Sequence, residues 1–257
     1  MAGSVRLETD ERGVAWLTIA RPEAKNAFDA RLVAELTARL GELDPAARCV
    51  VIGSEGDTFC AGADVGWMRA MADYTLEENL ADSRALAAMF ARLDELPMPL
   101  LARVQGAAIG GGAGLVAVAD LAVASLDAVF AFSEVRLGIL PAVISPYVVR
   151  KCGPAFATAA FVTGVRFDAR RAHQAGLVES LAAPGELDER LDHFIQTILA
   201  GGPRAVIAAK RLVRDVQGRR PDEVRDLTVE RIADIRASDE GQEGLRAFLE
   251  KRAPRWS

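Results

Sequence analysis

Residues 104–114 read VQGAAIGGGAG and lie between two apolar runs at 99–102 and 115–118. This pattern predicts a strand, a glycine-rich turn and the start of a helix. Three consecutive glycines leave backbone N–H groups uncovered, and the positive end of the helix dipole adds to them, so the turn suits a negatively charged ligand oxygen. The stretch therefore predicts either an oxyanion hole or a tight turn that packs closely on a neighbouring strand.

Two earlier segments show the same change from strand to helix. A β-branched strand at 49–54 runs into a loop of small residues at 55–65, and an amphipathic run follows. Further upstream, an apolar strand ends in a loop that contains Pro22, after which Asp29 can cap a helix. Three strand-to-helix corners at this spacing predict one shared ligand-binding edge.

Hydrophobic periodicity places secondary structure along the rest of the chain. We expect a hairpin of strands 4–9 and 13–20, strands at 48–54, 99–105, 120–125 and 129–133, and helices at 30–43, within 64–72, at 76–95 and at 112–119. After residue 145 we expect helices at 146–152, 154–163, 168–175, 187–200, 203–217, 221–237 and 238–251, with one strand at 177–181. Strands that alternate with helices predict an α/β core, and the final third is mostly helical.

Composition limits the class of protein. With 257 residues, 51% of them hydrophobic, and a net charge of −5, the chain can form one sizeable core and has no basic tract for nucleic acid. No apolar run is long enough to cross a bilayer and no leader pattern is evident, so we expect a cytoplasmic protein without a membrane partner. Three cysteines without CxxC spacing and two isolated histidines predict reduced thiols and no metal site.

Four segments resemble the successive signatures of the enoyl-CoA hydratase/isomerase (crotonase) superfamily. They are RPEAKNA at 21–27, FCAGADV at 59–65, GAAIGGG at 106–112 and FSEVRLGILP at 132–141. Their order and spacing agree with the family, and the resemblance covers nearly the whole chain. It implies a crotonase-like spiral of ββα units, with a core domain at 1–200 and a helical C-terminal trimerisation region at 201–257. The expected assembly is a homotrimer or a dimer of trimers.

The resemblance also implies a coenzyme A thioester as substrate, with no tightly bound cofactor. By position, the backbone amides of Ala63 and Gly111 look like the pair that holds the thioester oxygen. Fixed donors aimed at an oxygen that gains charge are worth about 10²–10³ in rate each. The residues expected to bind coenzyme A are Ala24, Lys25, Ala27, Ala61, Asp64 and Val65. Those expected to line the substrate pocket are Met68, Gly114, Leu137 and Pro141.

Glu134 is the candidate for proton transfer. It follows an apolar strand and precedes Gly138 and Pro141, so it can lie at a rigid strand end, where loss of solvent keeps a carboxyl partly protonated near neutral pH. Without the family register, an ordinary surface carboxylate in a loop would be the better explanation. In the family the matching glutamate is an acid/base, and we therefore assign this role to Glu134.

Gly114 departs from the pattern of the best-known hydratases, which carry a second glutamate at this position. A site with a single carboxylate resembles that of the family members that move a double bond from the 3- to the 2-position. The sequence at 133–147, however, resembles the branch that hydrates methylglutaconyl-CoA or isohexenylglutaconyl-CoA in leucine or acyclic terpene breakdown, which also has glycine there. We therefore expect a hydratase of a short or branched enoyl-CoA, with an isomerase as the alternative.

Two other classes of protein remain open. A scaffold that has lost one acid is also consistent with a non-catalytic protein that binds a CoA thioester. Residues 112–117 match G-x-G-x-x-A after a strand, and Glu134 lies at the distance of a ribose-binding acid, as in a dinucleotide-binding domain. Such a domain would need further βαβ units, whereas the chain becomes helical.

Overall fold

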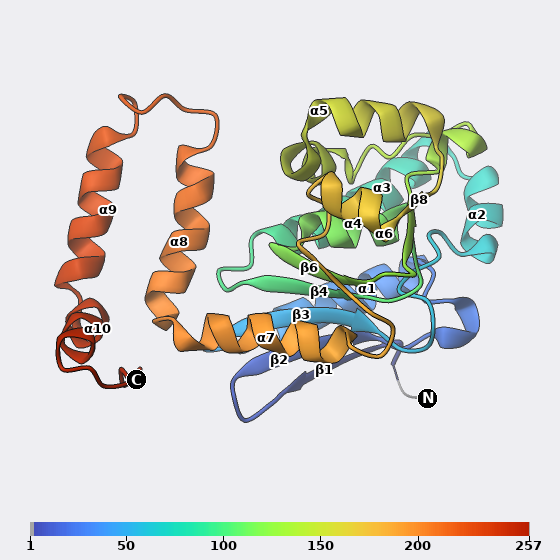
Figure 1. The fold of residues 1–257 in the computed structure, drawn as a ribbon. Helices are drawn as coiled ribbons and strands as arrows, with labels where there is room; N and C mark the ends of the chain where they lie inside the picture. The colour runs from blue at the N-terminus through green and yellow to red at the C-terminus, as the bar shows by residue number, and fades with distance from the viewer. Residues whose placement is uncertain (1–2, 257) are drawn as a thin grey trace.

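A six-stranded sheet forms the centre of the molecule in the computed structural model, which describes residues 3–256 (Figure 1). Its order is β1-β2-β3-β4-β6-β9, in which β1 and β2 form the predicted antiparallel hairpin and the other neighbours are parallel. The strands are β1 (Val5–Thr9), β2 (Val14–Ile19), β3 (Cys49–Ser54), β4 (Leu100–Val104), β6 (Leu121–Ser125) and β9 (Ser180–Ala182). The strand expected at 177–181 therefore lies slightly later.

The sheet is buried on both faces, as parallel sheets require. On one face, Val51 and Leu101 pack with Leu191 and Ile195 of α7 (Leu187–Ala200). On the other face lies the main core, which is covered by α1 (Ala30–Gly41) and α3 (Leu76–Asp94). Asp29 caps α1 by accepting a hydrogen bond from the Leu32 amide at 2.7 Å, as the sequence predicted.

A second, three-stranded sheet of order β5-β7-β8 lies beside α4. It consists of β5 (Ala107–Ile109), β7 (Val129–Ala131) and β8 (Phe167–Asp168), and the sequence analysis missed β5 and β8. Strands of two or three residues are too short to show a period, which explains the omission. The expected passage from strand directly to glycine turn and helix is therefore wrong, because β5 lies between Gly106 and the helix.

Helices cover the second sheet and the end of the first. They are α2 (Val65–Ala72), α4 (Gly111–Val118), α5 (Ser145–Thr163) and α6 (Ala169–Gln174), with 3₁₀ turns η1 (Pro22–Ala24) and η2 (Glu134–Leu137). The two helices expected at 146–152 and 154–163 are joined as α5, which is broken at Gly153 with φ +78°. The strand expected at 129–133 ends earlier, at Ala131, and Glu134 opens η2 instead of lying at a strand end.

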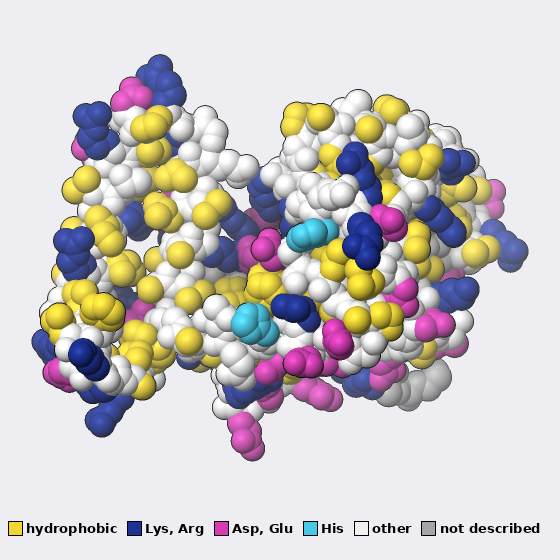
Figure 2. Space-filling model, in the orientation of Figure 1, with side chains coloured by type: hydrophobic (Ala, Val, Ile, Leu, Met, Phe, Trp, Pro, Cys, Tyr) yellow, Lys and Arg dark blue, Asp and Glu magenta, His cyan; other side chains and the backbone are white. Residues whose placement is uncertain are grey.

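The last three helices lie to one side of this core in Figure 1. They are α8 (Pro203–Val216), α9 (Arg225–Ala237) and α10 (Asp239–Leu249). Figure 2 shows hydrophobic side chains gathered over this region, and Val213, Phe248 and Leu249 are 65%, 81% and 78% exposed. Among the described residues, no helix combines the length and apolar character needed to cross a bilayer.

Candidate active site

Asn26 joins the first two corners of the predicted ligand-binding edge. This side chain is fully buried, and its amide donates hydrogen bonds to the carbonyl oxygens of Glu55 at 2.8 Å and Thr58 at 2.7 Å. Its Oδ1 accepts from the Arg21 amide at 2.9 Å. The sequence analysis assigned no role to Asn26. The available signal was an asparagine between Lys25 and Ala27 in a loop of this kind, because a buried amide must find several partners.

The backbone around Ala63 is held on one side by Phe28. The Phe28 amide donates to the carbonyl oxygen of Gly62 at 2.7 Å, and the Asp64 amide donates to the carbonyl oxygen of Phe28 at 2.7 Å. In a parallel bridge of this kind, the residue between the two bonded neighbours turns its own N–H to the opposite side. The Ala63 N–H therefore points away from the Phe28 backbone.

The same loop pairs with β5 through Cys60. The Cys60 amide donates to the carbonyl oxygen of Ala107 at 2.8 Å, and the Ile109 amide donates to that of Cys60 at 2.9 Å. These two bonds place the loop that carries Ala63 directly beside the strand that leads to Gly110. Main-chain hydrogen bonds thus join the second corner, at 55–65, to the third, at 104–114.

Gly110 and Gly111 form the turn from β5 into α4. Gly110 has φ +53° and ψ −118°, and its amide donates to the carbonyl oxygen of Ala131 at 2.8 Å. Gly111 is the first residue of α4, where a helical N–H has no partner within its own helix. Among residues 3–256, the N–H groups of Ala63 and Gly111 have no acceptor, and both residues are half-buried. Both amides are free to bind a ligand oxygen.

The Glu134 carboxyl lies against this turn. A Cβ built on Gly110 would be 3.1 Å from Glu134 Oε1. Its other oxygen, Oε2, is buried and has no hydrogen-bond partner within the described part of the chain. Burial raises the pKa of Glu134 above its usual value of 4.5. A carboxyl with a raised pKa and a free oxygen is suited to taking up and returning a proton.

Arg136 fixes the turn that carries Glu134. Its Nε donates to the carbonyl oxygen of Gly164 at 2.8 Å, and its Nη2 donates to that of Thr163 at 3.3 Å. Both acceptors lie at the C-terminal end of α5, where a cation is favourable. The orientation of η2 therefore depends on its contact with α5. The sequence pattern did not predict this contact.

The residues expected to bind coenzyme A lie on two adjacent loops. The Ala61 amide donates to the carbonyl oxygen of Lys25 at 3.0 Å, which joins the loops directly. Asp64 caps α2 through a hydrogen bond from the Gly66 amide at 2.7 Å, and its other oxygen lies 3.8 Å from Arg21. The six residues differ in exposure: Lys25 and Val65 are exposed, Ala24, Ala61 and Asp64 are half-buried, and Ala27 is buried.

The four residues expected to line the substrate pocket also differ in exposure. Met68 is half-buried, Leu137 is 61% exposed and Pro141 is buried. Gly114 is buried, and a Cβ at this position would lie 2.4 Å from Cγ2 of Ile144 and 3.1 Å from Cζ of Phe90. Ile144 and Phe90 thus occupy the space that a glutamate side chain would need.

Gly112 and Cys60 pack tightly together at the start of α4. A Cβ on Gly112 would be 2.7 Å from Cβ of Cys60, so this glycine allows close packing of the loop and leaves no open surface for a pyrophosphate. Burial raises the pKa of the Cys60 thiol to about 12, which keeps it protonated and argues against a nucleophilic role. The three cysteines are free thiols.

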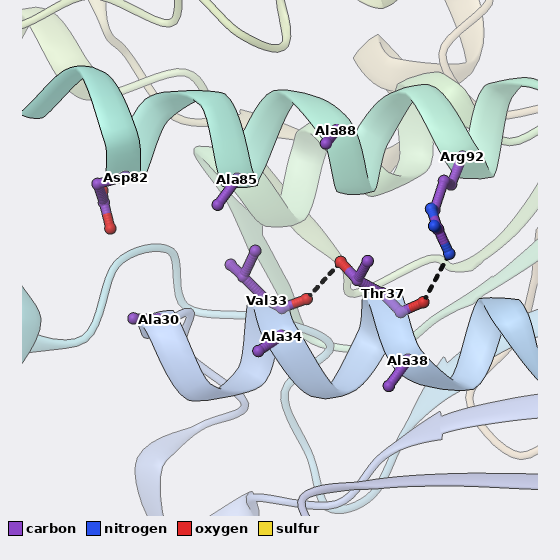
Figure 3. Close-up of a pocket in the computed structure, with 9 residues that line it drawn as sticks. All are labelled: Ala30, Val33, Ala34, Thr37, Ala38, Asp82, Ala85, Ala88 and Arg92. Carbon is purple, nitrogen blue, oxygen red and sulfur yellow. Dashed lines mark hydrogen bonds between the residues drawn. The ribbon is translucent and has the colours of Figure 1, made fainter.

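The predicted site residues line neither of two cavities elsewhere in the molecule. Figure 3 shows one of about 470 Å³ between α1 and α3, lined by Ala30, Val33, Ala34, Thr37, Ala38, Asp82, Ala85, Ala88 and Arg92. The other, of about 570 Å³, lies between the core and α8 and includes Lys151 and Lys210. Lys151 donates to the carbonyl oxygens of Val116 and Ala119, and Lys210 pairs with Asp120. Among the described residues, no cluster of three or more possible metal ligands occurs.

Residues 9–257 match the family model described as Enoyl-CoA hydratase/isomerase. The chain belongs to this family. The 2,3-dehydroadipyl-CoA hydratase of Escherichia coli (strain K12) is 33% identical over 259 residues, and the match covers 95% of each chain. This enoyl-CoA hydratase/isomerase family member is therefore related over nearly its whole length to a protein named for hydration of an enoyl-CoA.

Solved structures confirm the α/β crotonase fold. A Legionella pneumophila protein of the enoyl-CoA hydratase/isomerase (crotonase) group matches with a TM-score of 0.95 and 42% identity, covering 100% of both chains. An enoyl-CoA hydratase from Shewanella pealeana matches with a TM-score of 0.93 and 38% identity, covering 98% of this chain and 96% of that one. AtuE of Pseudomonas aeruginosa matches with a TM-score of 0.92 and 35% identity, covering 98% of each. The dinucleotide-binding alternative is therefore wrong.

The raised pKa of Glu134 predicts how stability depends on pH. Because burial makes the folded-state pKa higher than the unfolded one, the unfolded chain loses this proton first as the pH rises through 4.5, and the folded state is progressively penalised. Glu134→Gln should therefore raise the free energy of unfolding relative to wild type at about pH 8, with the difference shrinking towards about pH 4. Urea unfolding of both proteins at the two pH values measures this difference in stability. A larger stabilisation of Glu134→Gln at the acidic pH would contradict the prediction.

Proposed function

We propose that this enzyme adds water across the 2,3 double bond of a short or branched enoyl-CoA. The observation that carries the proposal is the position of the Glu134 carboxyl beside the Gly110–Gly111 turn, with a buried oxygen free of any partner in the described structure. The free amides of Ala63 and Gly111 lie on segments that are hydrogen-bonded through Cys60 and β5. This arrangement supplies one proton carrier and two donors for the same thioester.

In the proposed reaction, the two amides bind the thioester oxygen and Glu134 handles the water. The water oxygen bonds to C3 while Glu134 accepts one of its protons, and the electrons of the double bond move to the thioester oxygen as an enolate. Fixed N–H donors stabilise this charge. Glu134 then returns the proton to C2, which regenerates the carboxylate and completes the addition of water.

The packing around Gly114 supports an isomerase as the second candidate. Ile144 and Phe90 fill the position where the best-known hydratases carry their second carboxylate. A single base at Glu134 could remove a proton from C2 of a 3-enoyl-CoA and return it to C4, again through an enolate held by the two amides. This reaction needs no bound water, and one carboxylate suffices for it.

Turnover of a small substrate panel separates the candidates. Purified protein is incubated with a 2-enoyl-CoA, 3-methylglutaconyl-CoA and a 3-enoyl-CoA, and products are identified by mass. Uptake of water by either of the first two supports the hydratase. Conversion of the 3-enoyl compound alone, without a mass change, would replace the hydratase with the isomerase. Binding of all three without turnover would favour a non-catalytic CoA-thioester-binding protein.

The panel also tests whether the enzyme prefers an acyl chain that ends in a carboxylate. The Escherichia coli relative is named for 2,3-dehydroadipyl-CoA, whose acyl chain ends in a carboxylate. The 133–147 segment supports a glutaconyl-type substrate, which ends in the same group. Equal kcat/KM for neutral and acidic acyl chains would contradict this part of the proposal.

We further propose that the loops containing Ala24–Ala27 and Ala61–Val65 hold coenzyme A. The hydrogen bond between Ala61 and Lys25 brings these loops together beside Ala63, and Arg21 lies between the capping carboxylates of Asp29, at 2.7 Å, and Asp64, at 3.8 Å. Exposed Lys25 is the cation on these loops that can approach a phosphate. The backbone groups would carry most of the binding.

We propose a homotrimer, or a pair of trimers, assembled through 201–257. Several large apolar side chains of α8–α10 are exposed, and groups of exposed apolar side chains on one region often mark interaction sites. They are Val213, Val229, Ile232, Leu245, Phe248 and Leu249. Burying a Phe or Leu side chain stabilises an interface by about 1.5–3 kcal/mol.

Light scattering of the wild type is therefore expected to give the mass of three or six copies. Phe248→Asp combined with Leu249→Asp should shift the mass to that of one copy. Leu76→Asp is a matched control because Leu76 is equally exposed but lies at the start of α3, and it should leave the trimer intact. A wild-type monomer would overturn the assembly.

A further inference from the structure

We propose that Phe28 is a positioning residue that fixes the spacing between the two amides of the oxyanion hole. The inference rests on the proposed function, because it takes the N–H groups of Ala63 and Gly111 as the donors. Phe28 is only 2% exposed, so the proposal concerns how it holds these two groups rather than any contact with substrate.

The backbone of Phe28 sets the position of Ala63. Both of its main-chain groups are used, one in a bond to Gly62 and one in a bond from Asp64, each 2.7 Å long. These are the two neighbours of Ala63, so the peptide groups on both sides of Ala63 are held by Phe28. Gly62 has φ +97°, a conformation that favours glycine, and this allows the loop to bend around Phe28.

The ring of Phe28 sets the position of Gly111. A Cβ built on Gly111 would lie 3.1 Å from both Cδ2 and Cε2 of the ring, so the ring lies directly against the Gly111 backbone. Behind it, the ring of Phe90 lies 6.5 Å away, centroid to centroid, and Phe90 in turn packs against Gly114. The Phe28 ring is thus held between the core and the first turn of α4.

One residue therefore contacts both donor segments, by its backbone on one side and its ring on the other. The distance between the two amides depends on the thickness of this ring. A donor helps only when it points at the oxygen that gains charge, and a displacement of about 1 Å can cost about 10²-fold in rate. A smaller side chain at position 28 would let α4 move towards the loop without breaking the backbone bonds.

Phe28→Leu tests this inference, since leucine keeps the main-chain hydrogen bonds and removes the flat ring. The expected result is a fall in kcat of about 10–10²-fold with KM changed by less than about threefold, because binding of the rest of the substrate is untouched. Leu17→Ala is the control. Leu17 is fully buried in β2, so its truncation also costs stability, but kcat should stay near that of the wild type.

A second measurement separates positioning from general loss of packing. A β-ketoacyl-CoA can bind as its enolate, and the fraction of enolate, read by ultraviolet absorption, reports how strongly the two amides stabilise negative oxygen. Phe28→Leu should lower this fraction, whereas Leu17→Ala should not. Equal fractions in wild type and Phe28→Leu would overturn the role of Phe28. A wild type that forms no enolate would instead overturn the proposed oxyanion hole, so the two failures are distinguishable.

Discussion

Glu134→Gln is expected to lower kcat by about 10²–10⁴-fold, the usual contribution of a general acid/base, with little change in KM. Glutamine has nearly the same shape but can neither accept nor return the proton. The effect should appear for both candidate reactions, because hydration and isomerisation both pass the proton through this position.

The fold should survive this substitution. Oε2 of Glu134 has no partner among the described residues, so no hydrogen bond is lost there, and the cost of ionising a buried carboxyl is removed. Steady-state kinetics on the best substrate of the panel measures the effect. Glu11→Gln, an exposed carboxyl in the β1–β2 turn, is the matched control and should keep full activity. If Glu134→Gln retained most of the wild-type kcat, the assigned role would be wrong.

Gly106→Ala is expected to destabilise the protein by about 3–5 kcal/mol, or to prevent folding. A Cβ here would lie 1.9 Å from the carbonyl oxygen of Asp57 and 3.0 Å from its carbonyl carbon. Both atoms belong to the backbone, so no side chain can rotate away. Gly106 also has φ +59°, which adds about 1–2 kcal/mol for a residue with a Cβ.

Gly138→Ala separates these two causes. Gly138 has φ +73° and ψ 15°, but a Cβ there would meet no atom within 4 Å. The control should therefore lose only about 1–2 kcal/mol, from the backbone conformation alone. Urea unfolding of both variants measures the difference. If both variants lost the same free energy of unfolding, the close contact between Gly106 and the Asp57 carbonyl would not be what fixes the start of β5.

Much of the fold follows from sequence patterns alone. The hairpin, the parallel strands β3 and β4 and the helices α1, α3 and α7 lie within a few residues of the predicted ranges, because long apolar periods determine them. The elements that sequence reasoning missed are β5, β8, η1 and η2, which are each two to four residues long. Their conformation depends on neighbours far along the chain.

The candidate site, like the fold, could be predicted only in part from the sequence. The glycine run and Glu134 are visible in the sequence, and Asp64 could be placed before a helix. The capping of α2 by Asp64 and the roles of Asn26 and Phe28 appear only in three dimensions. Gly114 illustrates this well: the sequence shows that a carboxylate is missing, and the structure shows that Ile144 occupies its space.

The sequence by itself determined most of the longer strands and helices and the position of the glycine run, because these properties belong to local residue types and their spacing. Glu134 became the candidate for proton transfer through its position in the family pattern. Only the tertiary structure decided that Glu134 lies against Gly110, that Cys60 joins the Ala63 loop to β5, and that Phe28 lies between that loop and Gly111. Contacts between residues distant in the chain arise from strand pairing and close packing. No local pattern specifies them.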